Sequence, residues 1–307
     1  MLHYFKLIVL IKKSFMTRVI TCLLILFTSL IYSQQKTSEQ INIPFTLTPN
    51  GHIIIPANIN GIEGNFIFDT GAGINLLTKK FADKITDLEK TKHFYTGHRA
   101  TGEQIQSDLW NSKSLEIGDF KVRNEIFAVY DLEFPLDGLI SLTPFKQKQI
   151  TIDFKNKILS IESDESLNDL IAKKDFVIPI QISNDREIKI GISTKIQLND
   201  ELALNVGLDS GAGFDVYRFN SRYMEEFGID STKIKSEFKP SYFKPKEGNN
   251  YYYTILSKLT DDAKNVSVKD FKATFIEGLI YEGIMGINWL GEKITIDIPN
   301  KRLVVQN

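Results

Sequence analysis

The sequence predicts an all-β protein built from two similar lobes with a cleft between them. Two observations support this fold class. Four sequence blocks occur twice in the same order, so the chain contains an internal duplication. Within each copy, short runs rich in Ile, Val and Phe are bounded by Gly, Asn, Asp or Pro, which is typical of strands. In the first copy these runs are residues 51–59, 64–70, 113–122, 124–130 and 149–154. Two similar lobes dominated by strands predict paired β-barrels or sandwiches that meet at a cleft.

The repeated blocks define the limits of the lobes. FIFDTGAGINLL at 66–77 recurs as VGLDSGAGFDVY at 206–217, and ITIDFKNKIL at 150–159 recurs as ITIDIPNKRL at 294–303, with seven of ten positions identical. DGLISLTPF and Ile43-Pro44 also have counterparts, and all four pairs are offset by 135 to 145 residues. Four matches in one order indicate a tandem duplication, which is the pattern of a repeated structural unit.

The repeat predicts the domain organisation of the chain. We expect an N-terminal lobe over residues 34–160, a linker over 161–176 and a C-terminal lobe over 177–307. The linker is polar, and Ser163 is placed to cap one short helix within it. Longer helical periodicity occurs only after each Gly-Ala-Gly block, in residues 76–85 and 219–229, where we expect helices.

Residues 1–33 have the features of a secretory signal peptide. They contain four basic residues and no acidic one, and the apolar run VITCLLILFTSLI is followed by Tyr32-Ser33. Thirteen residues rise about 20 Å as a helix, which is less than the roughly 30 Å of a bilayer core. We therefore expect cleavage after Ser33, a periplasmic or secreted protein, and no stable membrane anchor. The alternatives are an uncleaved anchor and a buried core helix.

The composition excludes several classes of protein. The chain has 307 residues, of which 42% are hydrophobic and 24% charged, as in soluble globular proteins. Loss of residues 1–33 leaves 33 basic against 38 acidic residues, a net charge of −5, so we expect no nucleic-acid partner. The one cysteine, Cys22, lies in the leader, so the rest of the chain has none for a disulfide or a thiolate metal site.

The acids of the two repeated blocks, Asp69 and Asp209, are the candidate catalytic residues. Each follows an apolar strand and precedes Thr or Ser and then Gly-Ala-Gly. If the two blocks face each other with the carboxyl groups about 3 Å apart, both cannot ionise and they share one proton. The ionised member can take a proton from water while the neutral member donates to a carbonyl oxygen. A simple turn does not need an acid behind an apolar strand, where an unpaired charge is costly.

The residues that follow each acid suit this pairing. The glycines permit sharp turns and close approach of the opposite backbone, the alanines are small enough not to block it, and the hydroxyl groups can bond across to the opposite loop. The residues predicted to support the dyad are Thr70, Gly71, Ala72, Ser210, Gly211 and Ala212.

This constellation resembles the aspartic proteases, both the two-lobed pepsin-like enzymes and the retroviral enzymes with one lobe per chain. Asp69-Thr70-Gly71-Ala72 and Asp209-Ser210-Gly211-Ala212 match the D-[TS]-G-[AST] signature of that family. Ile284-Met285-Gly286 matches its later apolar–apolar–Gly stretch, and Leu139-Ile140-Ser141 is the first-lobe counterpart, with Ser in place of Gly. The similarity covers nearly all of residues 40–307.

The resemblance implies a fold and an activity. It implies two pseudo-symmetric pepsin- or retropepsin-like β-barrel lobes with the active site in the cleft between them. It also implies an aspartic endopeptidase that hydrolyses peptide or protein substrates, and we expect a monomer. Ala72 and Ala212 stand where pepsin-like lobes often carry Ser or Thr, which implies higher pKa values for the dyad and an optimum at mildly acidic to near-neutral pH.

A flap that closes over the substrate is also implied by the resemblance. The candidate segment is 93–110, whose glycines suit a hairpin tip. The candidate flap and substrate-contact residues are Tyr95, Gly97, His98 and Gly102. An ordinary surface hairpin is the alternative. In the second lobe, residues 242–255 contain three consecutive tyrosines, which either line the cleft or mark an edge strand.

Other chemistries lack the residues they need. After the leader only His52, His93 and His98 remain, with no HExxH pair, no G-x-S-x-G elbow and no phosphate-binding Gly-rich motif. We therefore expect no metal and no cofactor. Two other functions remain open: a non-catalytic exported peptide-binding protein on the same fold, and a structural or envelope-interaction protein.

Overall fold

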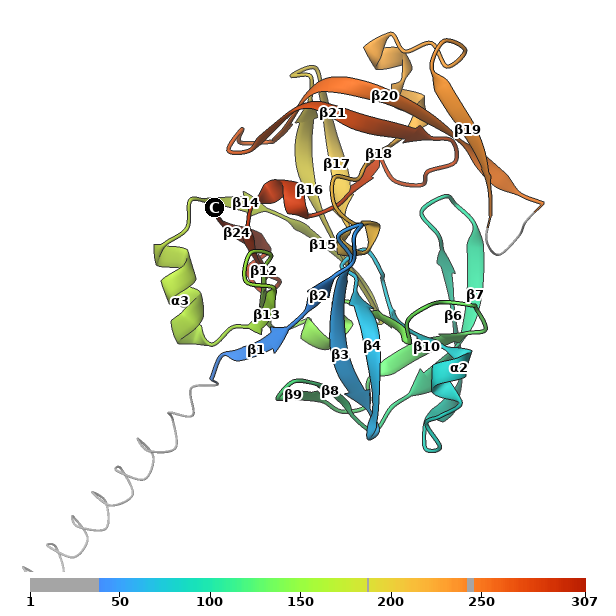
Figure 1. Ribbon diagram of the computed structural model, residues 1–307, viewed down its shortest axis with the longest axis vertical. Helices are drawn as coiled ribbons and strands as arrows, with labels where there is room; N and C mark the ends of the chain where they lie inside the picture. The colour runs from blue at the N-terminus through green and yellow to red at the C-terminus, as the bar shows by residue number, and fades with distance from the viewer. Residues whose placement is uncertain (1–38, 187, 242–245) are drawn as a thin grey trace, which may run out of the picture. The chain divides into compact units, whose positions relative to one another are not determined.

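The computed structural model describes residues 39–186, 188–241 and 246–307, and the predicted signal peptide lies outside them. Residues 40–307 form one compact unit. The all-β prediction is confirmed: the unit is built mainly from strands in three sheets, one for each lobe and one to which both halves of the chain contribute (Figure 1). Within the described residues no helix has the length and apolarity needed to cross a bilayer.

The N-terminal lobe contains a sheet of ten strands in the order β6-β7-β10-β5-β11-β4-β3-β8-β9, with β2 beside β3. Its strands are β2 (Thr46–Leu47), β3 (Ile53–Ile59), β4 (Ile62–Phe68), β5 (Asn75–Thr78), β6 (Glu89–His98), β7 (Gln104–Asn111), β8 (Leu115–Ile117), β9 (Phe120–Val122), β10 (Ile126–Tyr130) and β11 (Gly138–Ile140).

The C-terminal lobe contains a sheet of eight strands in the order β15-β16-β17-β22-β18-β21-β20-β19. Its strands are β15 (Gln181–Asp185), β16 (Lys189–Leu198), β17 (Leu202–Leu208), β18 (Tyr217–Asn220), β19 (Lys235–Pro240), β20 (Gly248–Asp261), β21 (Ser267–Ile276) and β22 (Gly283–Met285). The three consecutive tyrosines lie on β20, between β19 and β21, and not on the edge strand that the sequence suggested.

The third sheet has six strands and takes three from each half of the chain. Its order is β1-β13-β12-β23-β24-β14. The strands are β1 (Ile41–Pro44), β12 (Gln149–Asp153), β13 (Ile158–Ile161), β14 (Phe176–Pro179), β23 (Lys293–Asp297) and β24 (Arg302–Gln306). At its centre the two repeated ITID segments pair antiparallel, with Thr151 opposite Thr295 and their hydroxyl oxygens 2.8 Å apart. The blocks that match in sequence therefore hold the two halves together.

The identical Asp and Asn of these blocks have a structural reason. Each buried Asp ends its strand and accepts hydrogen bonds from the following turn. Asp153 accepts from the N–H of Asn156 at 2.8 Å, and Asp297 accepts from Nδ2 of Asn300 at 2.9 Å. Because a buried carboxylate needs such donors, the Asp and the Asn three residues later occur together in both copies.

The helices are short. Helix α3 (Asp164–Ala172) lies in the predicted linker, and Ser163 caps it through a capping box with Ser166, as expected. The longer helices expected after each Gly-Ala-Gly block are wrong. Within residues 76–85 only α2 (Lys79–Ala82) is helical, because residues 75–78 pair with β10 as strand β5. In the second lobe 219–229 contain two 3₁₀ turns, Ser221–Tyr223 and Glu225–Phe227. The other 3₁₀ turns are Thr143–Phe145, Ser210–Ala212 and Asn288–Leu290.

Candidate active site

Two equivalent strand arrangements deliver Asp69 and Asp209 to the site. Asp69 follows β4, which is parallel to β11, and its N–H donates to the Ile140 carbonyl at 2.9 Å. Asp209 follows β17, which is parallel to β22, and its N–H donates to the Met285 carbonyl at 2.8 Å. Buried Phe68 precedes the first acid and packs edge-on against Phe145, with the two ring centroids 5.9 Å apart. Each acid is thus anchored by its own sheet.

The two loops face each other so closely that each glycine lies against the opposite carboxyl group. A Cβ on Gly71 would lie 2.3 Å from Cγ of Asp209, and a Cβ on Gly211 would lie 2.3 Å from Cγ of Asp69. Real Cβ atoms do not approach other atoms this closely, so only glycine fits at either position. Each carboxyl group therefore lies directly beside the loop that carries the other.

The hydroxyl groups after the two acids hold the loops together. The N–H of Thr70 donates to Oγ of Ser210 at 3.0 Å, and the N–H of Ser210 donates to Oγ1 of Thr70 at 3.0 Å. Oγ1 of Thr70 donates to the Leu208 carbonyl at 2.7 Å, and Oγ of Ser210 donates to the Phe68 carbonyl at 2.8 Å. Both side chains are buried. These four hydrogen bonds join the two loops symmetrically, and we call them the Thr70–Ser210 lock.

The hydrogen bonds to the two acids differ. Oδ1 of Asp69 accepts from the N–H groups of Gly71 and Ala72, each at 2.9 Å. Among the described residues, no group donates a hydrogen bond to Oδ1 of Asp209, although this atom is buried. Backbone donors favour the charged form of a carboxyl group, and burial without donors favours the neutral form. The two acids are therefore inequivalent, despite their matching motifs.

The pKa values follow from this difference. Burial raises the pKa of Asp69, and the contact with Asp209 and the two N–H donors partly offset that rise. Burial raises the pKa of Asp209 well above its usual value, and the negative charge of Asp69 adds to the increase. His52 lies near Asp69 and Arg218 near Asp209, and each lowers the pKa of the acid beside it by a smaller amount, as does a backbone hydrogen bond from Ala212 to Asp209. Burial and the repulsion between the two charges therefore favour a pair that holds one proton.

Ser141 occupies the position in the first lobe that Gly286 occupies in the second. It belongs to a buried hydrogen-bond network. Its N–H and its hydroxyl donate to Oδ1 of Asn75 at 2.8 and 3.0 Å, and Asn75 in turn donates to Glu125 at 2.7 Å. In the second lobe a Cβ on Gly286 would lie 2.3 Å from the Gly213 carbonyl oxygen, so that position excludes any side chain. The first lobe has room for a side chain there and fills it with polar contacts.

The candidate flap forms a hairpin of β6 and β7, and strand alternation divides its predicted residues between two faces. Tyr95 and Gly97 share one face, and Oη of Tyr95 donates to Asp185 of the other lobe at 3.4 Å. His98 lies on the other, exposed face. Gly102 lies in the tip, with a φ of 82° that favours glycine. The arrangement brings Tyr95, and not His98, toward the opposite lobe.

Two segments that sequence reasoning did not identify also support the loops. The N–H of Phe214 donates to the Asn50 carbonyl at 2.9 Å, and the N–H of Ile190 donates to the Gly73 carbonyl at 3.1 Å. Each lobe thus holds the Gly-Ala-Gly loop of the other. Both segments follow the repeated Ile-Pro pair in their copy, which is the one signal in the sequence that points to them.

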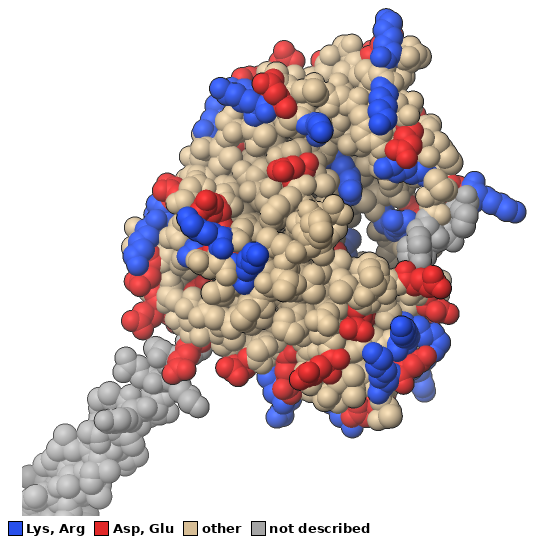
Figure 2. Space-filling model, viewed as in Figure 1, with Lys and Arg blue, Asp and Glu red and all other residues tan. Residues whose placement is uncertain are grey.

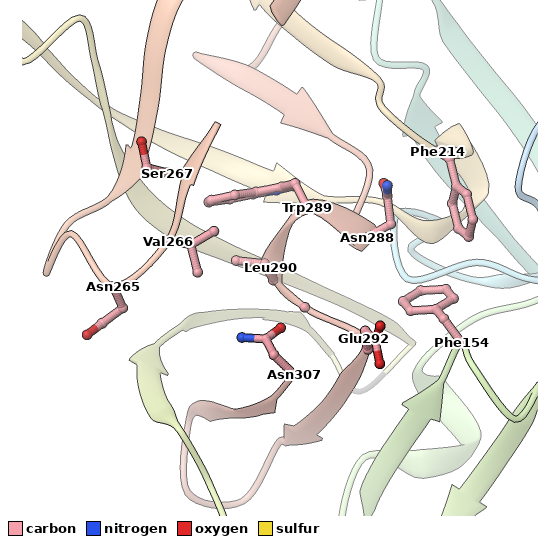
Figure 3. A pocket seen from close by; sticks show the side chains of 11 residues that line it. Phe154, Phe214, Asn265, Val266, Ser267, Asn288, Trp289, Leu290, Glu292 and Asn307 are labelled. Atoms are coloured by element: carbon pink, nitrogen blue, oxygen red, sulfur yellow. The ribbon is translucent and has the colours of Figure 1, made fainter. Parts of the chain in front are cut away.

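A separate hollow of about 530 Å³ opens on the C-terminal lobe, and neither aspartate lines it (Figure 3). Trp289 and Val266 form part of its wall, and the rings of Phe154 and Phe214 meet edge to face at one end of it. Within residues 39–186, 188–241 and 246–307, no three His, Asp, Glu or Cys side chains gather as they would around a metal ion. The carboxyl pair is therefore the candidate site that the rest of the structure supports.

Comparison with known proteins finds similarity to aspartic proteases. Residues 55–143 match the family model described as aspartyl protease. An uncharacterized protein of Rickettsia prowazekii (strain Madrid E) is 30% identical over 126 residues, which are 41% of this chain and only 54% of that protein. The crystal structure of the aspartic proteinase from Irpex lacteus superposes with a TM-score of 0.51 at 13% identity, covering 86% of this chain and 96% of that chain.

These similarities confirm the resemblance to aspartic proteases that the sequence indicates. The superposition shows the two-lobed, pepsin-like all-β fold. Residues 55–143 thus match an aspartyl protease model, and the fold is that of a pepsin-like aspartic proteinase.

Proposed function

We propose that this protein is an aspartic endopeptidase in which Asp69 and Asp209 form the catalytic dyad. The observation that carries the proposal is the mutual approach of the two loops, in which Gly71 lies against the Asp209 carboxyl and Gly211 against the Asp69 carboxyl. A fold does not by itself establish a function. Two half-buried acids that face each other, held by a symmetric hydrogen-bond lock, are an arrangement that acid–base hydrolysis needs and that folding alone does not.

The different surroundings of the two acids support different roles in the reaction. Asp69, ionised and held by two N–H donors, takes a proton from a water molecule, whose oxygen bonds to the peptide carbonyl carbon. Asp209, neutral because of its burial and its charged neighbour, gives its proton to the carbonyl oxygen. Asp69 then passes its proton to the amide nitrogen, and the C–N bond breaks as the carbonyl re-forms with return of a proton to Asp209. The Thr70–Ser210 lock keeps the carboxyl groups in register.

The activity is tested with the purified protein and a mixture of unstructured peptides. We expect cleavage at internal bonds and its inhibition by a pepstatin-type inhibitor, while a metal chelator has no effect. Binding of peptides without cleavage would favour a non-catalytic peptide-binding protein on this fold. Cleavage that resists the inhibitor but is stopped by the chelator would contradict the proposal.

The pH profile of kcat/KM is expected to have its maximum at mildly acidic to near-neutral pH. The active pair holds one proton, so activity rises with pH through the lower apparent pKa of the pair and falls through the higher one. Both pKa values are raised, so both limbs of the profile move upward. Initial rates with one peptide across the pH range measure this. A maximum below about pH 3, under the ordinary carboxyl range, would overturn the prediction.

We also propose that the protein is exported and works as a monomer. The support is the leader pattern of residues 1–33, together with two complete Asp-containing loops in one chain. Cell fractionation followed by N-terminal sequencing is expected to find the protein outside the cytoplasm with Gln34 at its N-terminus. A protein recovered from the cytoplasm with residues 1–33 still attached contradicts the export proposal.

A further inference from the structure

The tip of the β6–β7 hairpin crosses the cleft and contacts the C-terminal lobe through its backbone. The N–H of Ile280 donates to the Ala100 carbonyl at 2.9 Å. Gly102 and Gly278, with φ values of 82° and 73°, lie against each other at this point. A Cβ on Gly102 would lie 3.2 Å from the Gly278 carbonyl oxygen. Glycine on both sides lets the two backbones meet.

Side chains reinforce this contact. The Glu103 side chain is only 6% exposed, and its two carboxyl oxygens accept from Oγ of Ser241 at 2.7 and 2.6 Å. Ser241 follows β19, so the hairpins of both lobes meet here. Ala100 packs on a small apolar cluster of the C-terminal lobe formed by Ile276, Leu279 and Ile284. We call the contacts of Ala100 with Ile280 and of Glu103 with Ser241 the tip contact.

The tip contact and the stem of the hairpin both join the two lobes across the cleft. Tyr95, on the face of β6 that points toward the other lobe, donates to Asp185 at 3.4 Å. The Thr70–Ser210 lock joins the lobes on the side of the carboxyl pair. Figure 2 shows an opening that passes through the molecule between the two lobes. The cleft is therefore bridged at both the lock and the hairpin and is open at its ends.

We propose that the tip contact turns the cleft into a passage that admits polypeptide by a free chain end, so that the preferred substrates are linear, extended chains. The proposal rests on the proposed peptidase function and adds its substrate class. An extended strand is a single chain that can enter such a passage lengthwise. A cyclic peptide or a loop of a folded protein has no end to insert, so it reaches the carboxyl pair only when the tip contact opens.

The test locks the tip contact. In the full chain carrying Cys22→Ser, the substitutions Ala100→Cys and Ile280→Cys provide the only two thiols, which a short bismaleimide then joins. One peptide is supplied in linear form and in head-to-tail cyclic form. We expect the joined protein to cut the linear peptide at the rate of the unjoined protein and not to cut the cyclic peptide. The single-cysteine variants, treated with the same reagent, are the matched controls.

A second pair of variants weakens the tip contact without a cross-link. Ser241→Ala and Glu103→Gln raise the fraction of molecules in which the tip contact is open. Because the apparent affinity for a substrate that needs the open state scales with that fraction, kcat/KM for the cyclic peptide is expected to rise about tenfold. The value for the linear peptide is expected to stay unchanged, which separates this effect from a general change in stability.

The outcomes separate this proposal from the proposed function. Loss of linear-peptide cleavage on cross-linking, or cleavage of the cyclic peptide by the joined protein, overturns the passage while the unjoined protein still establishes a peptidase. Equal rates for both peptides in the unjoined protein overturn it as well. If the unjoined protein cuts neither peptide, the proposed function fails, and the passage fails with it.

Discussion

Asp69→Asn and Asp209→Asn are each expected to lower kcat for peptide cleavage by about 10³-fold or more, the scale of positioned acid–base catalysis. An asparagine at either position has no proton to share, so the pair loses either its base or its acid. The loss is measured as kcat with one linear peptide at the pH of maximum activity. Asp215→Asn is the matched control, because Asp215 lies at an exposed position of the same loop as Asp209.

The same variants are expected to be more stable than the natural protein at neutral pH. Both acids have a pKa that is higher in the folded chain than in the unfolded chain. Their ionisation therefore lowers the free energy of unfolding. This loss is absent at pH values below the pKa in the unfolded chain, and it grows as the pH rises toward the pKa in the folded chain. Asparagine removes the charge and the loss, so Tm at pH 7 rises while activity falls. Cleavage that persists in either variant dismisses the dyad.

Thr70→Ala is expected to lower the free energy of unfolding by about 2 to 6 kcal/mol. It takes the hydrogen-bond partner from two buried groups, the N–H of Ser210 and the carbonyl of Leu208, and each such loss costs about 1 to 3 kcal/mol. A typical domain has about 5 to 15 kcal/mol of stability, so the change is a large fraction of the total. Urea unfolding measures it, with an unchanged m-value as the check on two-state behaviour.

Two further variants show whether the hydroxyl itself is responsible. Thr70→Ser keeps the oxygen and removes only a methyl group, so it is expected to retain most of the stability. Ser210→Ala removes the reciprocal partner of the Thr70 N–H and of the Phe68 carbonyl, and its effect should match that of Thr70→Ala. Equal losses in Thr70→Ala and Thr70→Ser would attribute the effect to packing and contradict the hydrogen-bond lock.

Much of the fold could be predicted because the duplication is visible along the chain. Four blocks repeated in one order imply two matching lobes, and strand patterns within one copy apply to the other. The helices expected at 76–85 and 219–229 were wrong for a tertiary reason. Residues 75–78 form hydrogen bonds to β10, a strand about fifty residues later, and such pairing overrides local helical periodicity.

The candidate site could likewise be predicted only in part. The two acids and the hydroxyls beside them could be identified from a motif that occurs twice. The closure of the cleft could not, because it depends on Gly102 meeting Gly278 and on Glu103 meeting Ser241, residues more than 130 positions apart. None of these residues belongs to a sequence pattern, so neither periodicity nor spacing predicts the two contacts.

By itself, the sequence determines that this protein has two copies of one lobe and one informative acid in each, since a repeated motif is a local property of the chain. Only the tertiary structure decides how those acids differ. Asp69 accepts two backbone N–H groups, whereas Oδ1 of Asp209 is buried without a donor among the described residues. Matching motifs thus end in unlike surroundings, because burial and hydrogen-bond direction exist only once the lobes have met.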